Sequence, residues 1–434
     1  MNPTMIGLLS ILIVFALLFA RMPVAFVMLV VGMGGFALTR TPEAMYSIAS
    51  QTIYNTFASH SLIVIPMFVW MGYIAFYSGL SARIYEAAYK IVGSLKGGLA
   101  MATIAACTAF GAICGSTTAT AATMSAVALP EMKKYNYNRS FSTATIASAA
   151  ILGVMIPPSV IFILYGISAQ ESISRLFLAG ILPGFLLMAL FMLTAYFLAL
   201  RNPLMAPPGE RVTWADKVSA LLKGGVEVLF IFAAVMGGLF AGYFSPTEAG
   251  AVGAFSTLFV AVVRRRLDWS GFVKSLADSV RISAMIMFLV ASASIYGRFL
   301  AITGLPGGLA RWAVELPLSP LAIMAIVLLI YLVLGFFIDA LALILLTVPI
   351  FYPVAIELGF DPIWFGVIIV LALGMGVITP PVGANVYVVA GVDRDTPVME
   401  IFKGVGWYLV AIVFCIALLM IFPQIALFLP NLLR

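Results

Sequence analysis

The residues of this sequence that could carry chemistry are small polar side chains set inside apolar runs. Ser116, Thr117 and Thr118 lie between two apolar segments, and Asp339 is the one carboxylate deep within such a segment. Hydroxyl and carbonyl oxygens suit a hard cation, and a carboxylate at bilayer depth is a functional candidate by default. These residue types therefore predict ion binding inside a membrane.

A proline pair interrupts an apolar run twice. The first motif is Gly153-Val-Met-Ile-Pro-Pro158 and the second is Gly376-Val-Ile-Thr-Pro-Pro381. In a helix interior Gly costs about 1 kcal/mol and Pro about 3 kcal/mol, so both motifs predict an opened backbone. Such backbone is tolerated at bilayer depth only where it is buried in protein or lines a cavity. Paired breaks indicate a transporter binding site; the alternative is two ordinary proline kinks, which does not explain the repeated context.

The composition of the chain indicates a polytopic membrane protein. Of its 434 residues, 63% are hydrophobic and only 9% are charged, a balance that soluble domains do not have. The net charge of +6 is spread through loops, so we expect no nucleic-acid partner. The three cysteines form no CxxC pair and His60 is the only histidine, which argues against disulfides, a metal cluster and a membrane-embedded enzyme.

Apolar segments predict an all-α chain that crosses the bilayer many times. Single spans are expected at residues 3–20, 23–39, 61–78, 174–200, 225–243, 247–263, 282–302 and about 406–429. Residues 42–57, 82–95 and 269–280 are mixed or amphipathic and are expected at the membrane interface. Residues 201–224 form the expected linker between halves, and a short loop with Pro306 is expected after residue 302.

Each half also contains a predicted helical hairpin followed by a broken helix. The hairpins are expected at 98–132 and 320–356, and the broken helices at 140–168 and 362–391. As one straight helix, residues 98–132 would be about 52 Å long, more than a hydrocarbon core of about 30 Å. A turn is therefore required, and the only cluster of small polar residues there is 115–118.

The distribution of basic residues predicts the orientation. With the N-terminus and C-terminus on the periplasmic side, all but five of the 23 Lys and Arg residues lie on the cytoplasmic side. The five exceptions are Arg40, Arg175, Arg298, Arg311 and Arg434. In this orientation the two hairpins are re-entrant from opposite sides of the membrane, so the halves form an inverted repeat.

The expected organisation has five parts. Residues 1–60 are N-terminal scaffold helices, and residues 61–168 are the first repeat, with an arm, a hairpin and a broken helix. Residues 169–268 are scaffold helices and the linker, residues 269–391 are the second repeat, and residues 392–434 are a C-terminal scaffold helix.

The hairpin tips and helix breaks together predict at least two Na⁺ sites and one anion site. A tip exposes carbonyls that can ligate a cation and amides that suit a carboxylate. The first predicted sodium site is Gly115, Ser116, Thr117, Gly153, Ile156 and Pro157, and the second is Gly335, Ile338, Asp339, Gly376, Thr379 and Pro380. The predicted substrate site is Ser116, Thr118, Ser159, Asn385 and Arg298.

Two of these residues have competing interpretations. Asp339 is either an ion ligand or a helix N-cap at the tip. Arg298 is either a counter-charge for the substrate or a side chain that extends to the outer interface, and the sequence favours the interface.

With these residues placed, nearly the whole chain resembles the large membrane subunit of a tripartite ATP-independent periplasmic (TRAP) transporter. The resemblance includes Arg21-Met-Pro-Val-Ala-Phe26, Gly115-Ser-Thr-Thr-Ala119, Ser245-Pro-Thr-Glu-Ala-Gly250 and both proline pairs, in order. It implies an elevator-type, Na⁺-driven importer of a carboxylate, such as a C4-dicarboxylate or sialic acid, in a bacterial inner membrane. It also implies a small four-helix membrane subunit and a periplasmic substrate-binding protein as partners.

Two other transport functions remain open. A Na⁺/carboxylate symporter that works without a binding protein would share most of these features. An ion channel would also use re-entrant segments, but channels usually close a pore with symmetric subunits, and two inverted hairpins in one chain favour a carrier.

Overall fold

The structure is a computed structural model that describes residues 3–210 and 212–433, and every regular element in that part is helical. Six helices are long and apolar enough to cross a membrane, and a seventh span results if a bent pair of helices is counted as one. Arg434 of the orientation argument lies outside the described residues. The prediction of an all-α membrane protein is confirmed.

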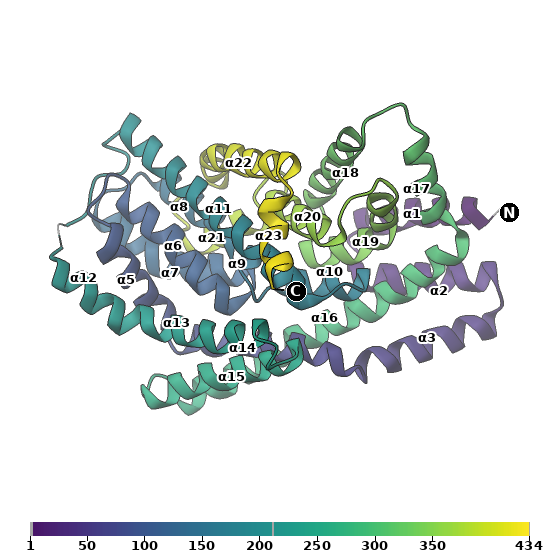
Figure 1. The fold of residues 1–434 in the computed structure, drawn as a ribbon, viewed down its shortest axis with the longest axis horizontal. Coiled ribbons are helices and arrows are strands. Elements are labelled where there is room, and N and C mark those ends of the chain that lie inside the picture. Colours follow the sequence, from purple (N-terminus) through teal and green to yellow (C-terminus); the bar gives the residue numbers. More distant parts are fainter. Residues whose placement is uncertain (1–2, 211, 434) are drawn as a thin grey trace.

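One group of helices packs around the long helix α16 (Trp269–Thr303), which runs from the centre toward the right of Figure 1. Its members are α1 (Pro3–Phe19), α2 (Val24–Thr39), α3 (Pro42–Phe57) and α4 (Val64–Tyr77, after a 3₁₀ turn at His60–Ile63). We add α15 (Pro246–Val263), which packs against α4. Tyr77 donates a 2.6 Å hydrogen bond to Asp278, which fixes the end of α4 on α16. We call these six helices the α16 group.

The second group contains both helix–turn–helix pairs and both broken helices. The first half supplies α6 (Gly98–Cys114), α7 (Thr117–Lys134), α8 (Arg139–Ala149), α9 (Leu152–Met155), α10 (Val160–Ala169) and α11 (Ile173–Arg201). The second half supplies α17 (Leu305–Glu315), α18 (Pro320–Gly335), α19 (Ala340–Glu357), α20 (Pro362–Gly376), α21 (Ala384–Val392), α22 (Val398–Ile421) and α23 (Gln424–Leu432). We call this the α6–α20 group.

The elements between the groups include the arm helix α5 and a helix with two π-helical turns. α5 (Leu80–Val92) packs on α6 and on the π turn Leu221–Gly225. That turn joins α12 (Trp214–Ala220) to α13 (Val226–Phe232), and a second π turn, Ala233–Gly237, leads to α14 (Gly238–Phe240). The predicted linker 201–224 is therefore partly helical, because Thr213 caps the first turn of α12.

Three segment predictions are wrong in the second half. Residues 269–280 are not separate from the following span, since no proline lies between Trp269 and Thr303 and α16 is continuous. The predicted loop at Pro306 is helix α17, because Pro is tolerated in a first helical turn. The predicted final span is two helices, since α22 ends before Pro423 and α23 follows.

Both helix–turn–helix pairs turn where the apolar runs are interrupted, at the small polar cluster 115–118 in the first half and at residues 335–339 in the second. Gly115 has a φ of +63°, a left-handed conformation that glycine adopts readily, and it ends α6. Ser116 then caps α7 by accepting a hydrogen bond from the amide of Ala119. In the second half Asp339 caps α19 by accepting a 3.0 Å hydrogen bond from the amide of Leu341.

Both broken helices open at the proline pairs. In the first half, Arg139–Met155 and Val160–Ala169 are bent by 45°. In the second, α20 ends at Gly376 and α21 begins at Ala384. The breaks that the sequence predicted are confirmed.

A contact between glycines joins each pair to its broken helix. A Cβ atom added to Gly111 of α6 would lie 2.3 Å from the Cα atom of Gly153. In the second half, a Cβ atom added to Gly376 would lie 2.9 Å from the Cα atom of Gly335. The two halves thus repeat a close backbone approach that no larger residue permits.

We predict that Gly111→Ala lowers the thermal stability of the detergent-solubilised protein. The added methyl group must displace the backbone of α9, and overpacking of this kind costs about 1–3 kcal/mol. Gly406→Ala on α22 is the matched control, because no atom lies within 4 Å of its added Cβ. Equal melting temperatures for the two variants would contradict the tight contact.

Candidate functional site: a cavity between the two tips

Both tips line one cavity of about 460 Å³ at the boundary between the two helix groups. The first tip contributes Cys114 to Ala119, and the second contributes Asp339, Ala340 and Leu341. The opposite wall comes from α4 and α16 of the α16 group. Residues from distant parts of the chain therefore meet at a volume that suits a small organic molecule.

At the first tip, hydroxyl groups face the cavity from the start of α7. Ser116 and Thr118 place their hydroxyl oxygens 3.3 Å apart, and Thr118 is exposed. Gly115 and Thr117 also line the cavity and are buried. The amide end of α7, with its partial positive charge, is thus directed toward the cavity, which favours an anion there.

Behind the first tip lie the backbone oxygens of the first break. A Cβ atom on Gly115 would lie 2.8 Å from the carbonyl oxygen of Pro158. A Cβ atom on Gly153 would lie 2.8 Å from the Thr120 hydroxyl and 3.3 Å from the Ser116 carbonyl oxygen. Glycines at these two positions thus allow the oxygen atoms of the first tip and the first break to approach the backbone closely.

The second tip differs because a carboxylate caps its helix. Asp339 lines the cavity and accepts the hydrogen bond from Leu341 that caps α19. Asp339 is therefore the N-cap of α19, and its role as an ion ligand stays a prediction. Gly335 is buried against Gly376, and Ile338 is buried behind the tip, so neither lines the cavity.

The second break lies behind that tip and is more open than the first. Thr379 donates a 2.7 Å hydrogen bond to the carbonyl of Met375, which leaves its oxygen able to accept a cation. Pro380 is exposed, whereas Ile156 and Pro157 of the first break are buried. The two breaks correspond in sequence but not in exposure.

Asn385 connects the two halves. Its side chain is fully buried, and its Nδ2 donates a 3.1 Å hydrogen bond to the carbonyl of Ala147 in α8. Its Oδ1 has no hydrogen-bond partner among the described residues, although buried acceptors are normally paired. This hydrogen bond connects the second broken helix to the first. The Oδ1 atom of Asn385 is a buried acceptor without a hydrogen-bond donor among the described residues.

Two other predicted substrate residues are not brought into the cavity. Ser159 is fully buried and caps α10 by accepting a hydrogen bond from the amide of Phe162. Arg298 is exposed on α16 and is not among the lining residues.

The sequence analysis missed the wall formed by the α16 group. It consists of Val69, Gly72, Tyr73 and Phe76 on α4, and Ile282, Met285 and Ile286 on α16. A Cβ atom on Gly72 would lie 3.0 Å from the carbonyl oxygen of Cys114, so α4 touches the first tip directly. In the sequence, apolar side chains at helical spacing look the same on a lipid-facing and on a cavity-facing helix. Gly72 and Tyr73 are the residues whose types could have indicated that this face of α4 meets protein.

No three His, Cys, Asp or Glu side chains come together within residues 3–210 and 212–433. A cation held near these tips would therefore be ligated mainly by carbonyl and hydroxyl oxygens. Such a ligand set suits Na⁺ better than a transition metal.

Comparison with known proteins identifies the family. Residues 11–425 match the family described as "Tripartite ATP-independent periplasmic transporter, DctM component". The chain belongs to this family. It is a large permease of the TRAP transporter type, embedded in a membrane, and its relatives are transporter permeases and not enzymes.

Two relatives illustrate the similarity. The C4-dicarboxylate TRAP transporter large permease protein DctM of Pseudomonas aeruginosa is 34% identical over 392 residues, which cover 90% of this chain and 91% of the relative. The sialic acid TRAP transporter large permease protein SiaM of Vibrio cholerae is 34% identical over 419 residues, 96% of each chain.

The fold also resembles a solved transporter structure. The Alcanivorax borkumensis YdaH transporter superposes with a TM-score of 0.65 over 97% of this chain and 98% of that chain. The sequence identity is 14%, so the likeness concerns the fold alone.

We predict that a cysteine at position 118 of this permease reacts with a soluble maleimide much faster than one at position 120. Thr118 is exposed in the cavity, whereas Thr120 on the same helix is fully buried. The background should carry Cys114→Ser, because Cys114 lines the cavity, while Cys107 and Cys415 are fully buried. Mass spectrometry measures the modification, and equal rates would show that the first tip is not accessible.

Proposed function

We propose that this permease carries out Na⁺-coupled uptake of an organic carboxylate across the bacterial inner membrane. The observation that carries the proposal is the meeting of two helix–turn–helix tips, each backed by a broken helix, at one cavity. Transporter sites are typically built in this way, with helix ends directed at the cargo.

The proposed sodium sites use oxygens at the two tips and breaks. The first would draw on Ser116 and the Pro158 carbonyl, which lie close to Gly153 and Gly115 respectively. The second would draw on the Thr379 hydroxyl and the backbone around Gly376. Two such sites beside the cavity would make substrate binding depend on Na⁺, because each ion orders the tip that the substrate contacts.

A carboxylate is the substrate class that we propose. The two relatives named above are designated as transporters of a C4-dicarboxylate and of sialic acid, both carboxylates. In the cavity, the Ser116 and Thr118 hydroxyls and the amide end of α7 offer hydrogen bonds to such a group. The partial positive charge at the amide end of α7 would disfavour binding of a cation that is not accompanied by an anion.

An elevator mechanism accounts for the two helix groups. In this mechanism the tips and broken helices would move as one body against the α16 group. The wall between them is mostly apolar, with Gly72 against Cys114 at the closest point. Such a surface has few directional bonds to break during sliding.

The family name further supports a periplasmic binding protein and a small membrane subunit as partners.

Uptake in proteoliposomes tests the coupling. With the small subunit and a cognate binding protein present, an inward Na⁺ gradient should drive accumulation of the carboxylate, and replacing Na⁺ by K⁺ should abolish it. Equal uptake with K⁺ would refute the coupling. Na⁺-driven uptake that does not need the binding protein would instead favour a binding-protein-independent symporter.

We predict that Thr379→Val raises the Na⁺ concentration for half-maximal uptake about tenfold. Loss of one ligand to a charged partner costs about 1.5 kcal/mol or more, and about 1.4 kcal/mol corresponds to a factor of ten. Thr194→Val on α11 is the matched control, since the Thr194 hydroxyl donates to the Leu190 carbonyl away from the cavity. An unchanged Na⁺ dependence in Thr379→Val would remove Thr379 from the proposed site.

A further inference from the structure

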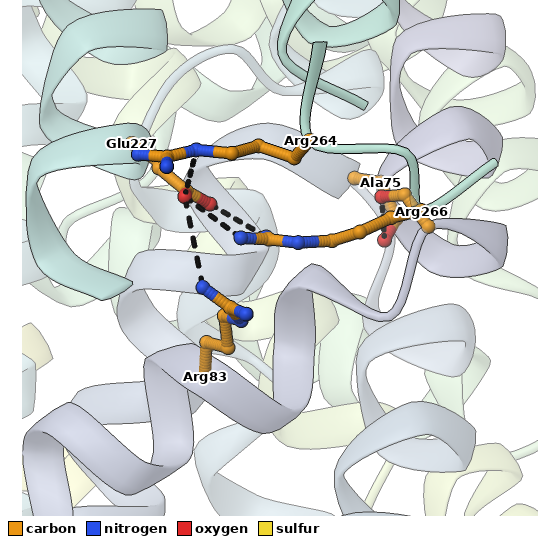
Figure 2. Close-up of polar contacts among 6 residues, drawn as sticks. Ala75, Arg83, Glu227, Arg264 and Arg266 are labelled. Carbon is orange, nitrogen blue, oxygen red and sulfur yellow. Dashed lines mark hydrogen bonds and ion pairs between the residues drawn. The ribbon is translucent and has the colours of Figure 1, made fainter. Parts of the chain in front are cut away.

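A buried carboxylate outside the cavity is surrounded by three arginines (Figure 2). Glu227 of α13 accepts hydrogen bonds of 2.7 and 2.9 Å from the two terminal nitrogens of Arg266. The Nε of Arg264 lies 3.0 Å from the Oε1 atom of Glu227, and a terminal nitrogen of Arg83 lies 3.9 Å from the same oxygen. We call these four residues the Glu227 cluster.

The cluster joins three elements that are far apart in the sequence. Arg83 lies on the arm helix α5, Glu227 follows the π turn Leu221–Gly225, and both remaining arginines lie in the link from α15 to α16. A Cβ atom on Gly224 would lie 2.6 Å from the carbonyl oxygen of Arg83, so α5 and the π turn touch through their backbones. The backbones that carry Arg83 and Glu227 are thus held against each other by packing.

The charges of the cluster do not balance. Among these four described side chains, one carboxylate faces three guanidinium groups. The inner pair is shielded, since the Glu227 side chain is 4% exposed and that of Arg266 is 14% exposed. The outer arginines are open to the surroundings, with side chains 45% exposed at Arg83 and 53% exposed at Arg264. The guanidinium groups on the accessible side are thus those of Arg83 and Arg264.

The surroundings of the cluster are apolar and face outward. On α15, the turn that precedes Arg264 exposes Val262 and Val263, and Phe259 is exposed one turn earlier. On α13, Leu229 and Phe230 are exposed next to Glu227. A ligand that combines a negative group with long apolar chains would fit both parts of this surface.

We propose that the Glu227 cluster binds the phosphate group of an anionic phospholipid. The basic residues that set the orientation predict this end of α15 to be cytoplasmic, where the leaflet surface is negative. A phosphate oxygen near Arg83 and Arg264 offsets the repulsion between two guanidinium groups that share one carboxylate oxygen. The acyl chains lie along the exposed apolar faces of α13 and α15. The lipid thereby holds the arm helix against the α16 group.

Lipid retention by the full-length chain tests the proposal. Native mass spectrometry of the purified protein is recorded with added phosphatidylglycerol or phosphatidylcholine. The wild type should retain phosphatidylglycerol preferentially, and Arg264→Gln should weaken that retention about fivefold, the effect expected for one basic residue near an anionic membrane surface. The Arg266–Glu227 pair remains in this variant, so the fold should persist, as a monodisperse elution profile would verify.

Arg265→Gln is the matched control, since it removes the same charge from the same link, while the ion pairs of Glu227 in the described part of the chain are with Arg83, Arg264 and Arg266. It should retain the lipid like the wild type. Equal retention by Arg264→Gln and the wild type would overturn the proposal, and so would equal loss in both variants. Displacement of the lipid by inorganic phosphate alone would overturn the lipid assignment. If Arg264→Gln does not fold, Arg83→Gln carries the same test with the same expected loss.

Discussion

The structure depends on a constraint that membranes place on backbone polar groups. A helix opened at bilayer depth exposes amides and carbonyls that lipid cannot satisfy. Here both openings face other protein segments, the first against the tip at Gly115 and Ser116, the second against Gly335. Because two breaks need two partners, the chain supplies two helix–turn–helix pairs. The cavity lies where these four elements come together.

Glycine makes that arrangement possible in both halves. The contacts between Gly111 and Gly153, and between Gly335 and Gly376, bring backbones closer than any side chain would allow. Close approach keeps oxygen atoms near the tips without filling the space between them. The halves nevertheless differ, since Ser116 caps the first tip and the carboxylate of Asp339 caps the second. Pseudo-symmetry of the backbone thus supports a site whose two sides have different charge.

The polar contacts outside the cavity mostly fix helices within one group or at its edge. Tyr77 bonded to Asp278 holds α4 on α16, and Asn385 bonded to Ala147 holds the two broken helices together. The Glu227 cluster ties the arm helix to the link after α15. By contrast, the wall between the tips and the α16 group is lined mainly by apolar residues and glycine.

The sequence by itself determined the membrane class, the order of most helices, both tips and both breaks. It could do so because apolar length, glycine, proline and capping residues act locally on the backbone, as at Gly115, Asp339 and Pro157. It failed where a local signal allowed two readings, since the polar start of α16 and Pro306 in the first turn of α17 are both compatible with helix. Only the tertiary structure decided that Gly72 and Tyr73 face the first tip and that Arg298 does not. The reason is that apolar helices carry no local mark of which face meets lipid and which meets protein, so their rotation is settled by contacts between distant segments.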